Sequence, residues 1–118
     1  MIEELVVRVF ASRNAAHLEH WRTKSFAQHK ALGHFYDGVI DDIDKLVEAH
    51  QGAIELVDLT ELPKQMKPAN IIAMLEDDVV WINKNRKAIT NGLPALDNIL
   101  QELEGTYMSA LYKLKHLS

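Results

Sequence analysis

The sequence predicts an all-α protein, a four-helix bundle formed by a single domain over residues 1–118. A chain of 118 residues suits one hydrophobic core. Four stretches repeat apolar residues at intervals of three and four, the spacing that places side chains on one face of an α-helix. The connections between these stretches are unequal in length, two short and one long, and this difference bears on the topology.

The first helix is expected from about Ile2 to Arg22. Its apolar stripe continues by threes and fours to Arg13, His17 and His20, so the imidazoles are expected to follow the buried face. The apolar members of the stripe are Ile2, Leu5, Val6, Val9, Phe10 and Ala16.

The second helix is predicted to begin sharply after Ser25. The Ser25 hydroxyl is placed to cap the Gln28 amide, and the Gln28 side chain is placed to reach back, which is a capping-box pattern. Gly52 is a good residue to end this helix. The apolar stripe between them is Leu32, Tyr36, Ile40, Ile43 and Val47.

The third helix is predicted from Pro68 to about Thr90, because proline is accepted in a first helical turn. Asn91-Gly92 is expected to end it, and Pro94 to open the fourth helix. The two stripes are Ile71, Leu75, Val79, Ile82, Arg86 and Ile89, and then Leu96, Ile99, Leu100, Leu103, Tyr107, Leu111 and Leu114.

The connection lengths predict the topology. Helices one and two, and likewise three and four, are joined by two or three residues, so each pair must be antiparallel. The middle connection, about fifteen residues, reaches about 50 Å when extended, whereas a helix of about 25 residues is roughly 37 Å long. One long crossover between helices two and three would make them parallel, which is the ferritin-like arrangement. An up-down-up-down bundle with a long loop is the alternative.

Composition and charge exclude several functions. The net charge is −4 and the basic residues are scattered, so direct DNA binding is not expected. The absence of cysteine excludes a disulfide framework and a thiolate metal site. Neither a membrane-spanning segment nor a signal peptide is recognisable, so we expect a cytoplasmic protein without membrane partners.

Acidic residues gather on the second predicted helix. Asp37, Asp44 and Glu48 are separated by seven and four positions and share one face, with Asp41 nearby. Carboxylates on a partly apolar face need neutralisation, because burial of unpaired charge is unfavourable. A divalent cation is one solution and Arg13 or a lysine is another. A solvated stripe with nothing bound is the third.

Histidine is the unusual residue in this composition. Four of the six histidines, His17, His20, His29 and His34, fall within eighteen positions. His17 and His20, three apart, point to one side of a helix. Imidazole and carboxylate donors without thiolate suit iron, manganese or zinc. No Glu-x-x-His occurs, so the usual di-iron motif within one subunit is absent.

The order of these residues resembles the signature of the Dps-like proteins, or miniferritins. The resemblance covers about residues 16–52 and rests on His20-Trp21, Phe26, His29, Phe35-Tyr36, Asp44, Glu48 and Gly52, with His29 fifteen and nineteen positions before the two acids. It implies a ferroxidase site at a two-fold interface, with His20 from one subunit and Asp44 and Glu48 from its partner. His29 would supply a second, weaker metal position. The first turn is shorter than in that family, and Gly33 stands where an acid is common.

We therefore predict a ferritin-like, metal-binding homo-oligomer, at least a dimer, that oxidises Fe(II). The ligands are His20, Asp44, Glu48 and His29, with His17, Asp37 and Asp41 as additional candidates. A non-catalytic bundle for protein association is the main alternative, and a zinc or manganese hydrolase is the third. Trp21 and Trp81 are expected to be packing residues, and His34, His50 and His116 to lie at the surface.

Overall fold

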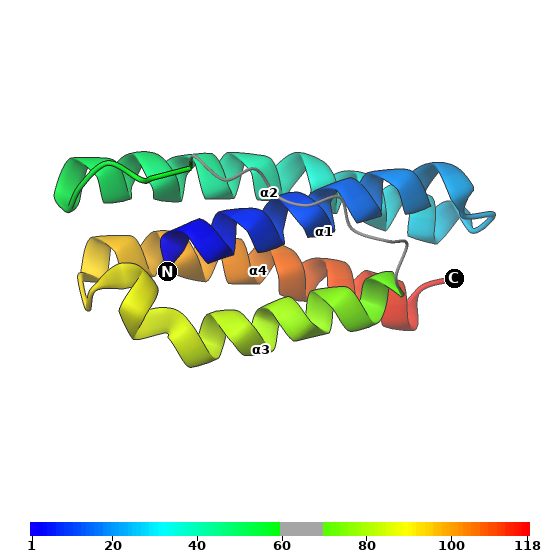
Figure 1. The fold of residues 1–118 in the computed structure, drawn as a ribbon. Helices are drawn as coiled ribbons and strands as arrows, with labels where there is room; N and C mark the ends of the chain where they lie inside the picture. The colour runs from blue at the N-terminus through cyan, green and yellow to red at the C-terminus, as the bar shows by residue number, and fades with distance from the viewer. Residues whose placement is uncertain (60–69) are drawn as a thin grey trace.

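The computed structural model describes residues 1–59 and 70–118, and within them every regular element is an α-helix. The helices are α1 (Ile2–Arg22), α2 (Phe26–Ala53), α3 (Ile71–Thr90) and α4 (Pro94–His116). They lie lengthwise against one another (Figure 1). The predicted all-α, four-helix bundle is confirmed.

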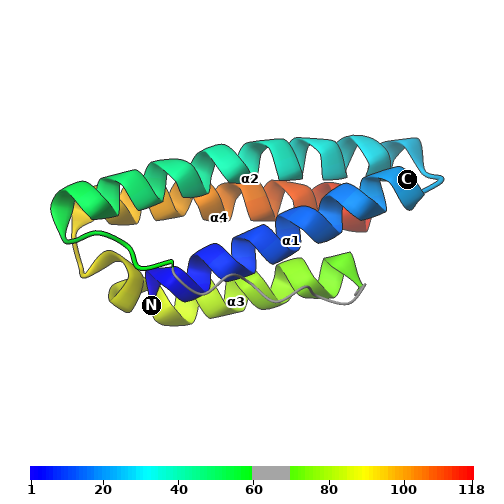
Figure 2. The ribbon, with the colours of Figure 1, turned by 45° about the horizontal axis from the view of Figure 1, so that its top comes forward.

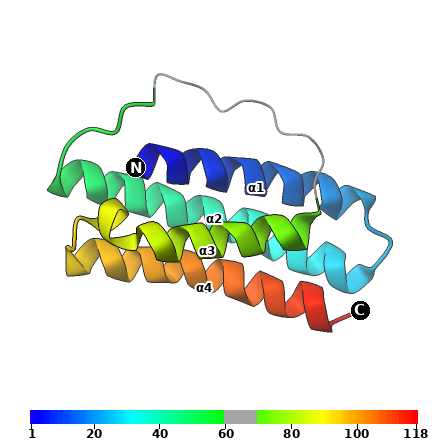
Figure 3. The same cartoon turned by 60° about the horizontal axis from the view of Figure 1, so that its bottom comes forward.

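The four helices form a ring in the order α1, α2, α4, α3, in which each helix packs against its two neighbours. Figures 2 and 3 show the same arrangement from two further sides. α1 and α4 therefore lie diagonally across the bundle, as do α2 and α3. The core sits along the common axis of the four helices.

Contacts between α4 and its neighbours give the helix directions. On α2, His34 is near Lys113 and Lys45 is near Glu102, so α2 and α4 are antiparallel. α3 is also antiparallel to α4, because Arg86 pairs with Asp97, near the start of α4, and Glu76 with Lys115, near its end. α2 and α3 consequently run in the same direction, and the end of α2 lies at the opposite end of the bundle from the start of α3 (Figure 1).

The turn between α1 and α2 differs in detail from the predicted capping box. The Ser25 hydroxyl accepts a hydrogen bond from the Gln28 backbone N–H at 3.2 Å, as predicted. The Gln28 side chain, however, accepts from the hydroxyl of Thr23 at 2.8 Å instead of reaching the Ser25 backbone. The Ser25 N–H donates to the same Thr23 oxygen. Thr23 thus stabilises both sides of the turn. At the other end, α2 ends at Ala53, one residue beyond Gly52, so the predicted end near Gly52 is confirmed.

The ends of α3 are set by asparagine at both sides. Asn70 caps its start by accepting from the Ala73 N–H at 3.1 Å. Pro68, the predicted start, lies outside the described residues, as does the middle of the predicted crossover. At the other end, Asn91 and Gly92 adopt φ values of 55° and 72°. These left-handed conformations end α3 and let α4 begin directly at Pro94.

The core is apolar along the stripes that the sequence predicts. Phe35 of α2 meets Tyr107 of α4 edge to face, with ring centroids 4.9 Å apart. The largest fully buried side chains are Tyr107, Phe35, Leu5, Leu32, Leu46, Leu75, Ile82, Ile89, Leu96, Leu100, Leu103 and Val9. Burial of each large apolar side chain contributes about 1.5–3 kcal/mol, and the core therefore provides most of the driving force for folding.

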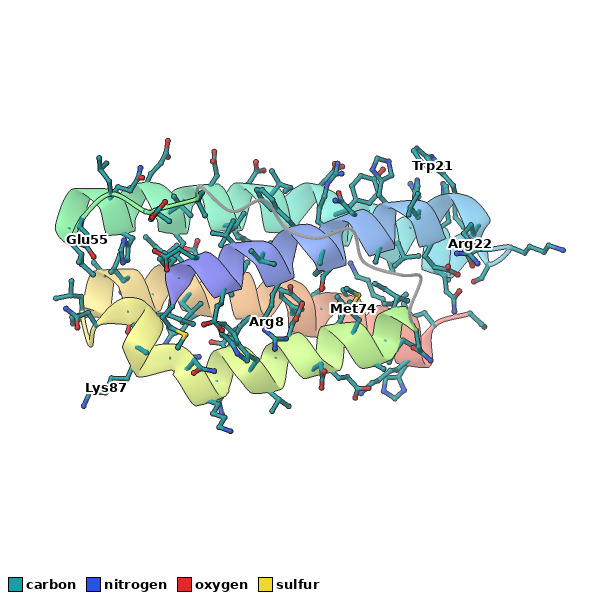
Figure 4. The ribbon with its side chains drawn as sticks, in the orientation of Figure 1. Arg8, Trp21, Arg22, Glu55, Met74 and Lys87 are labelled. Atoms are coloured by element: carbon teal, nitrogen blue, oxygen red, sulfur yellow. The ribbon has the colours of Figure 1, made fainter. Side chains whose placement is uncertain are left out.

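Three predictions about single residues were wrong. Phe10 is 40% exposed rather than buried, because it lies at the edge of the apolar stripe of α1. His50 is 9% exposed rather than at the surface, because it continues the buried face of α2 beyond Leu46. Trp21 is 68% exposed rather than packed, because it lies on the outer side of the last turn of α1 (Figure 4). Trp81 packs against the core as expected, and His34 and His116 are exposed as expected.

Candidate functional site

Two predicted metal ligands, His20 and His29, form a reciprocal pair beside the α1–α2 turn. The Nδ1 atom of His20 lies 2.6 Å from the carbonyl oxygen of His29, and the Nδ1 atom of His29 lies 2.7 Å from the carbonyl oxygen of His20. A carbonyl oxygen only accepts hydrogen bonds, so each Nδ1 carries a proton and donates. In each neutral ring the free lone pair is therefore on Nε2.

This arrangement suits metal binding, because metal-ligating histidines commonly donate their other ring N–H to a backbone carbonyl. The two rings are stacked, with centroids 3.6 Å apart and planes inclined by 16°. Their Nε2 lone pairs lie in nearly parallel planes and do not converge on one point about 2 Å from both nitrogens. His20 and His29 are thus not arranged to chelate one ion together.

Gly33 leaves room for the His20 ring. A Cβ atom at Gly33 would lie 3.3 Å from Cε1 of His20 and 3.5 Å from its Nδ1. The closer of these contacts is tighter than side chains usually make, so a larger residue would displace the imidazole. The presence of glycine at position 33 is therefore explained by the space that the His20 ring occupies.

His17 lies beside the pair in a row of aromatic rings. Its ring stacks on Tyr36 with centroids 4.0 Å apart and contacts Trp21 at 4.3 Å. The Arg13 guanidinium lies 5.3 Å from the centre of the Tyr36 ring. All of these side chains except Trp21 are half-buried, so Arg13, His17 and His20 lie at the edge of the buried face rather than inside it.

The predicted carboxylate ligands lie on α2, on the C-terminal side of His29. Asp37, Asp41, Asp44 and Glu48 are all exposed on α2. Asp44 is fifteen residues beyond His29, a distance of about 22 Å along a helix. One chain therefore does not bring His29 and Asp44 together. Among the described residues, no group of three metal-ligating side chains is arranged around a common point.

The polar cluster that sequence reasoning missed lies in the centre of the bundle. Asp78 of α3 is 3% exposed and accepts hydrogen bonds from Ser12 of α1 and, at 2.7 Å, from the hydroxyl of Tyr107 of α4. Arg8 pairs with its other carboxylate oxygen at 3.3 Å. Asp78 lies three residues after Leu75 and four before Ile82, both in the predicted stripe. The sequence signal for this cluster was the occurrence of a carboxylate at a position of the apolar stripe.

Burial dominates the electrostatics of this cluster. It raises the pKa of the Asp78 carboxyl, although the hydrogen bonds from Ser12, Tyr107 and Arg8 act in the opposite direction. Burial also raises the pKa of the Tyr107 hydroxyl well above its ordinary value, and the adjacent Asp78 carboxylate adds to this effect. Tyr107 therefore remains a hydrogen-bond donor at neutral pH.

A second buried carboxylate is neutralised by a cation. Glu104 of α4 is 6% exposed and pairs with the Arg86 guanidinium of α3. Arg86 also pairs with Asp97 at 2.5 Å. Arg86 occupies the predicted stripe of α3, so its position inside the bundle agrees with the sequence pattern. The pair joins α3 to α4 near the turn that connects them.

The fold and these polar clusters define an all-helical bundle protein. No helix in the described residues combines the length and the apolar character needed to cross a membrane. The chain belongs to DUF5856, a family of unknown function whose pattern matches residues 20–114. The match begins at His20 and includes all of α2, α3 and most of α4. No curated protein and no solved structure matches the chain.

Proposed function

We propose that this protein is a ferritin-like, metal-binding homodimer, or a larger assembly of such dimers, that oxidises Fe(II) at its subunit interface. His20 of one subunit would join Asp44 and Glu48 of the other around an iron ion, and His29 would hold a second, weaker position. His17, Asp37 and Asp41 are further candidate ligands. Manganese and zinc suit the same donors. Direct DNA binding is not part of the proposal, because the net charge is −4.

The observation that carries this proposal is the fixed orientation of the two histidines. Each Nδ1–H is held by a backbone carbonyl, so each Nε2 lone pair is ready to bind a cation without rearrangement of the ring. Packing between two histidines does not require this bonding pattern. The pattern is what a mixed nitrogen and oxygen metal site needs.

The charge distribution along α2 favours an antiparallel partner. Exposed basic side chains lie just before α2 and in its first turns, at Lys24 and Lys30, whereas most of its exposed acidic side chains lie in its second half. A second copy running in the opposite direction would bring unlike charges together. The midpoint between His29 and Asp44 falls at Tyr36–Asp37. A two-fold axis there would set His29 of each subunit level with Asp44 of the other.

The helix directions support the ferritin-like part of the proposal. All four neighbouring pairs are antiparallel while α2 and α3 run in the same direction, as a single long crossover between two hairpins requires.

In the proposed reaction, two Fe(II) ions would each give one electron to hydrogen peroxide. The peroxide would take up two protons and leave as two water molecules.

Fe(II) oxidation by peroxide and by oxygen tests this function. We compare the wild type with the double variant His20→Ala/Glu48→Gln, following the ferric absorbance. The matched control is His116→Ala/Glu102→Gln, which makes the same two chemical changes at exposed positions of α4. We expect oxidation well above buffer in the wild type and the control, and its loss in the test variant. Equal rates in all three proteins would refute the metal site.

An association module is the second candidate, and one surface favours it. Leu18, Trp21 and Phe26 are 53%, 68% and 74% exposed beside the α1–α2 turn. Exposed apolar groups of this size commonly mark interaction surfaces. Sedimentation with and without Fe(II) distinguishes the association module from the Fe(II)-oxidising protein. If the His20→Ala/Glu48→Gln variant still self-associates and the wild type does not oxidise Fe(II), the association module is favoured.

A further inference from the structure

A cavity of about 620 Å³ opens between α1 and α3. Neither His20 nor His29 lines it, and it takes no part in the proposed function. Its volume lies in the range of small-molecule sites, about 300–1,000 Å³. Arg8 and Met74, which line it, lie between the two helices in Figure 4. The described residues that line it are Glu3, Glu4, Val7, Arg8, Ala11, Asp58, Leu59, Met74, Asp77 and Asp78.

The polar part of this lining is strongly acidic. Of the described lining residues, five are carboxylic acids and Arg8 has the one basic side chain. Glu3 contacts the N-terminal ammonium at 2.8 Å, and Asp78 pairs with Arg8. Within the described residues, neither Glu4 nor Asp77 forms an ion pair. Acidic side chains therefore outnumber basic ones among the described residues of α1 and α3 that line the cavity.

The remainder of the lining is apolar. Val7 and Ala11 of α1, Met74 of α3 and Leu59 supply hydrocarbon surface between the carboxylates. A bare metal ion would leave this surface without contacts, and no three metal-ligating groups converge here among the described residues. The lining instead matches a ligand with an aliphatic body and positive charges that are separated from one another.

We infer that the α1–α3 cavity binds an aliphatic polyamine. Its ammonium groups would meet Glu4 on α1 and Asp77 on α3, and its methylene groups would contact Val7 and Met74. The axes of packed helices lie about 8–10 Å apart. An extended polyamine with several methylene groups between its ammonium groups spans a distance of that order, so one ligand would contact carboxylates on both walls. The inference needs no metal and no second subunit.

The protein contains a reporter for this site. Trp81, one of two tryptophans, has the Arg8 guanidinium 4.8 Å from the centre of its ring. Arg8 lines the cavity, so a bound cation that displaces it changes the surroundings of the indole. Replacement of the exposed Trp21 by Phe leaves Trp81 as the single tryptophan. Fluorescence of this Trp21→Phe protein then reports on the cavity.

Titration with spermidine, 1,4-diaminobutane, butylamine, butyrate and Mg²⁺ at constant ionic strength tests the inference. We expect saturable binding that is tightest for spermidine, weaker for the diamine and weakest for butylamine, with no response to butyrate. Glu4→Gln/Asp77→Asn should weaken spermidine binding roughly tenfold. Glu76→Gln/Glu102→Gln removes two exposed carboxylates outside the cavity and should leave the affinity unchanged.

Circular dichroism confirms that each variant remains folded, and amide chemical shifts of Val7 and Met74 locate the ligand on both walls. Three results would overturn the inference. These are no binding at millimolar spermidine, an equal affinity for Mg²⁺ and spermidine, and an equal loss of affinity in both double variants. The first shows an unoccupied cavity, and the other two show general attraction of cations to an acidic protein.

Discussion

The hydroxyl of Tyr107 on α4 donates a hydrogen bond of 2.7 Å to the carboxylate of Asp78 on α3, in the interior of the bundle. Ser12 of α1 donates to the same oxygen. Three helices are thereby joined through one acceptor. Because Ser12 and Tyr107 are both buried, each of these two hydrogen bonds replaces water that the core excludes. This relationship gives the first two predictions.

Tyr107→Phe should destabilise the protein by about 1–2 kcal/mol, because it keeps the ring packing and removes one hydrogen bond to a buried charge. Urea denaturation measures the change in the free energy of unfolding. Tyr112→Phe is the matched control, since Tyr112 is 58% exposed on the same helix and should change stability by less than about 0.5 kcal/mol. Similar effects of the two substitutions would contradict the structural role of the Tyr107 hydroxyl.

Asp78 should make part of the stability depend on pH. Its pKa is raised in the folded protein above the ordinary value of 3.8, so the folded state binds more protons than the unfolded state over this interval. The contribution is fully present below about pH 3.8 and is lost as pH rises through the higher folded pKa. Stability of the wild type relative to Asp78→Asn should therefore fall as pH rises above that value. A constant difference in the free energy of unfolding between the two proteins over this pH range would refute a raised pKa of Asp78 in the folded protein.

Gly33 and Gly105 should respond differently to alanine. Nothing lies within 4 Å of a Cβ atom at Gly105, so Gly105→Ala should stabilise α4 by up to about 1 kcal/mol. Gly33→Ala has the same intrinsic gain but presses on the His20 ring, so we expect a smaller gain and a shifted His20 imidazole resonance. Denaturation and histidine NMR measure both effects. An equal gain with an unchanged His20 signal would show that this contact is not close.

Arg86 should be more important for stability than an exposed base. Arg86→Met leaves Glu104 buried without its cation and should cost about 3 kcal/mol. Arg86→Met/Glu104→Leu removes both charges and should recover much of that loss, because an apolar pair replaces the ion pair. Thermal and urea denaturation of the single and double variants check this. A double variant less stable than Arg86→Met would show that Glu104 has another stabilising partner.

The sequence predicted the helices well because their signals are local. The apolar period, the Ser25 cap and the Asn91-Gly92 stop involve residues within a few positions of one another, and the structure has helices at those places. The same reasoning placed His50 and Trp21 wrongly. Each lies near a helix end, where the direction of a side chain depends on what the neighbouring helices cover.

The candidate site could be predicted only in part. The short turn after α1 makes His20 and His29 neighbours, and both the clustering and the turn length are visible in the sequence. The reciprocal carbonyl bonds and the ring stacking require coordinates. The resemblance to the miniferritins implied that Asp44 and Glu48 are metal ligands. Within one chain they are exposed and remote from His20, so their role as ligands stays a prediction that depends on a second subunit.

By itself, the sequence determined the all-helical class, the positions of the four helices and the faces that they bury, because a period of three to four residues is a property of each segment alone. Only the tertiary structure decided that Asp78 meets Ser12 and Tyr107, that Arg86 reaches Glu104, and that a cavity opens between α1 and α3. These contacts join residues far apart in the chain. Their formation depends on how far each helix is shifted and rotated against its neighbours, which side-chain packing across the whole core decides.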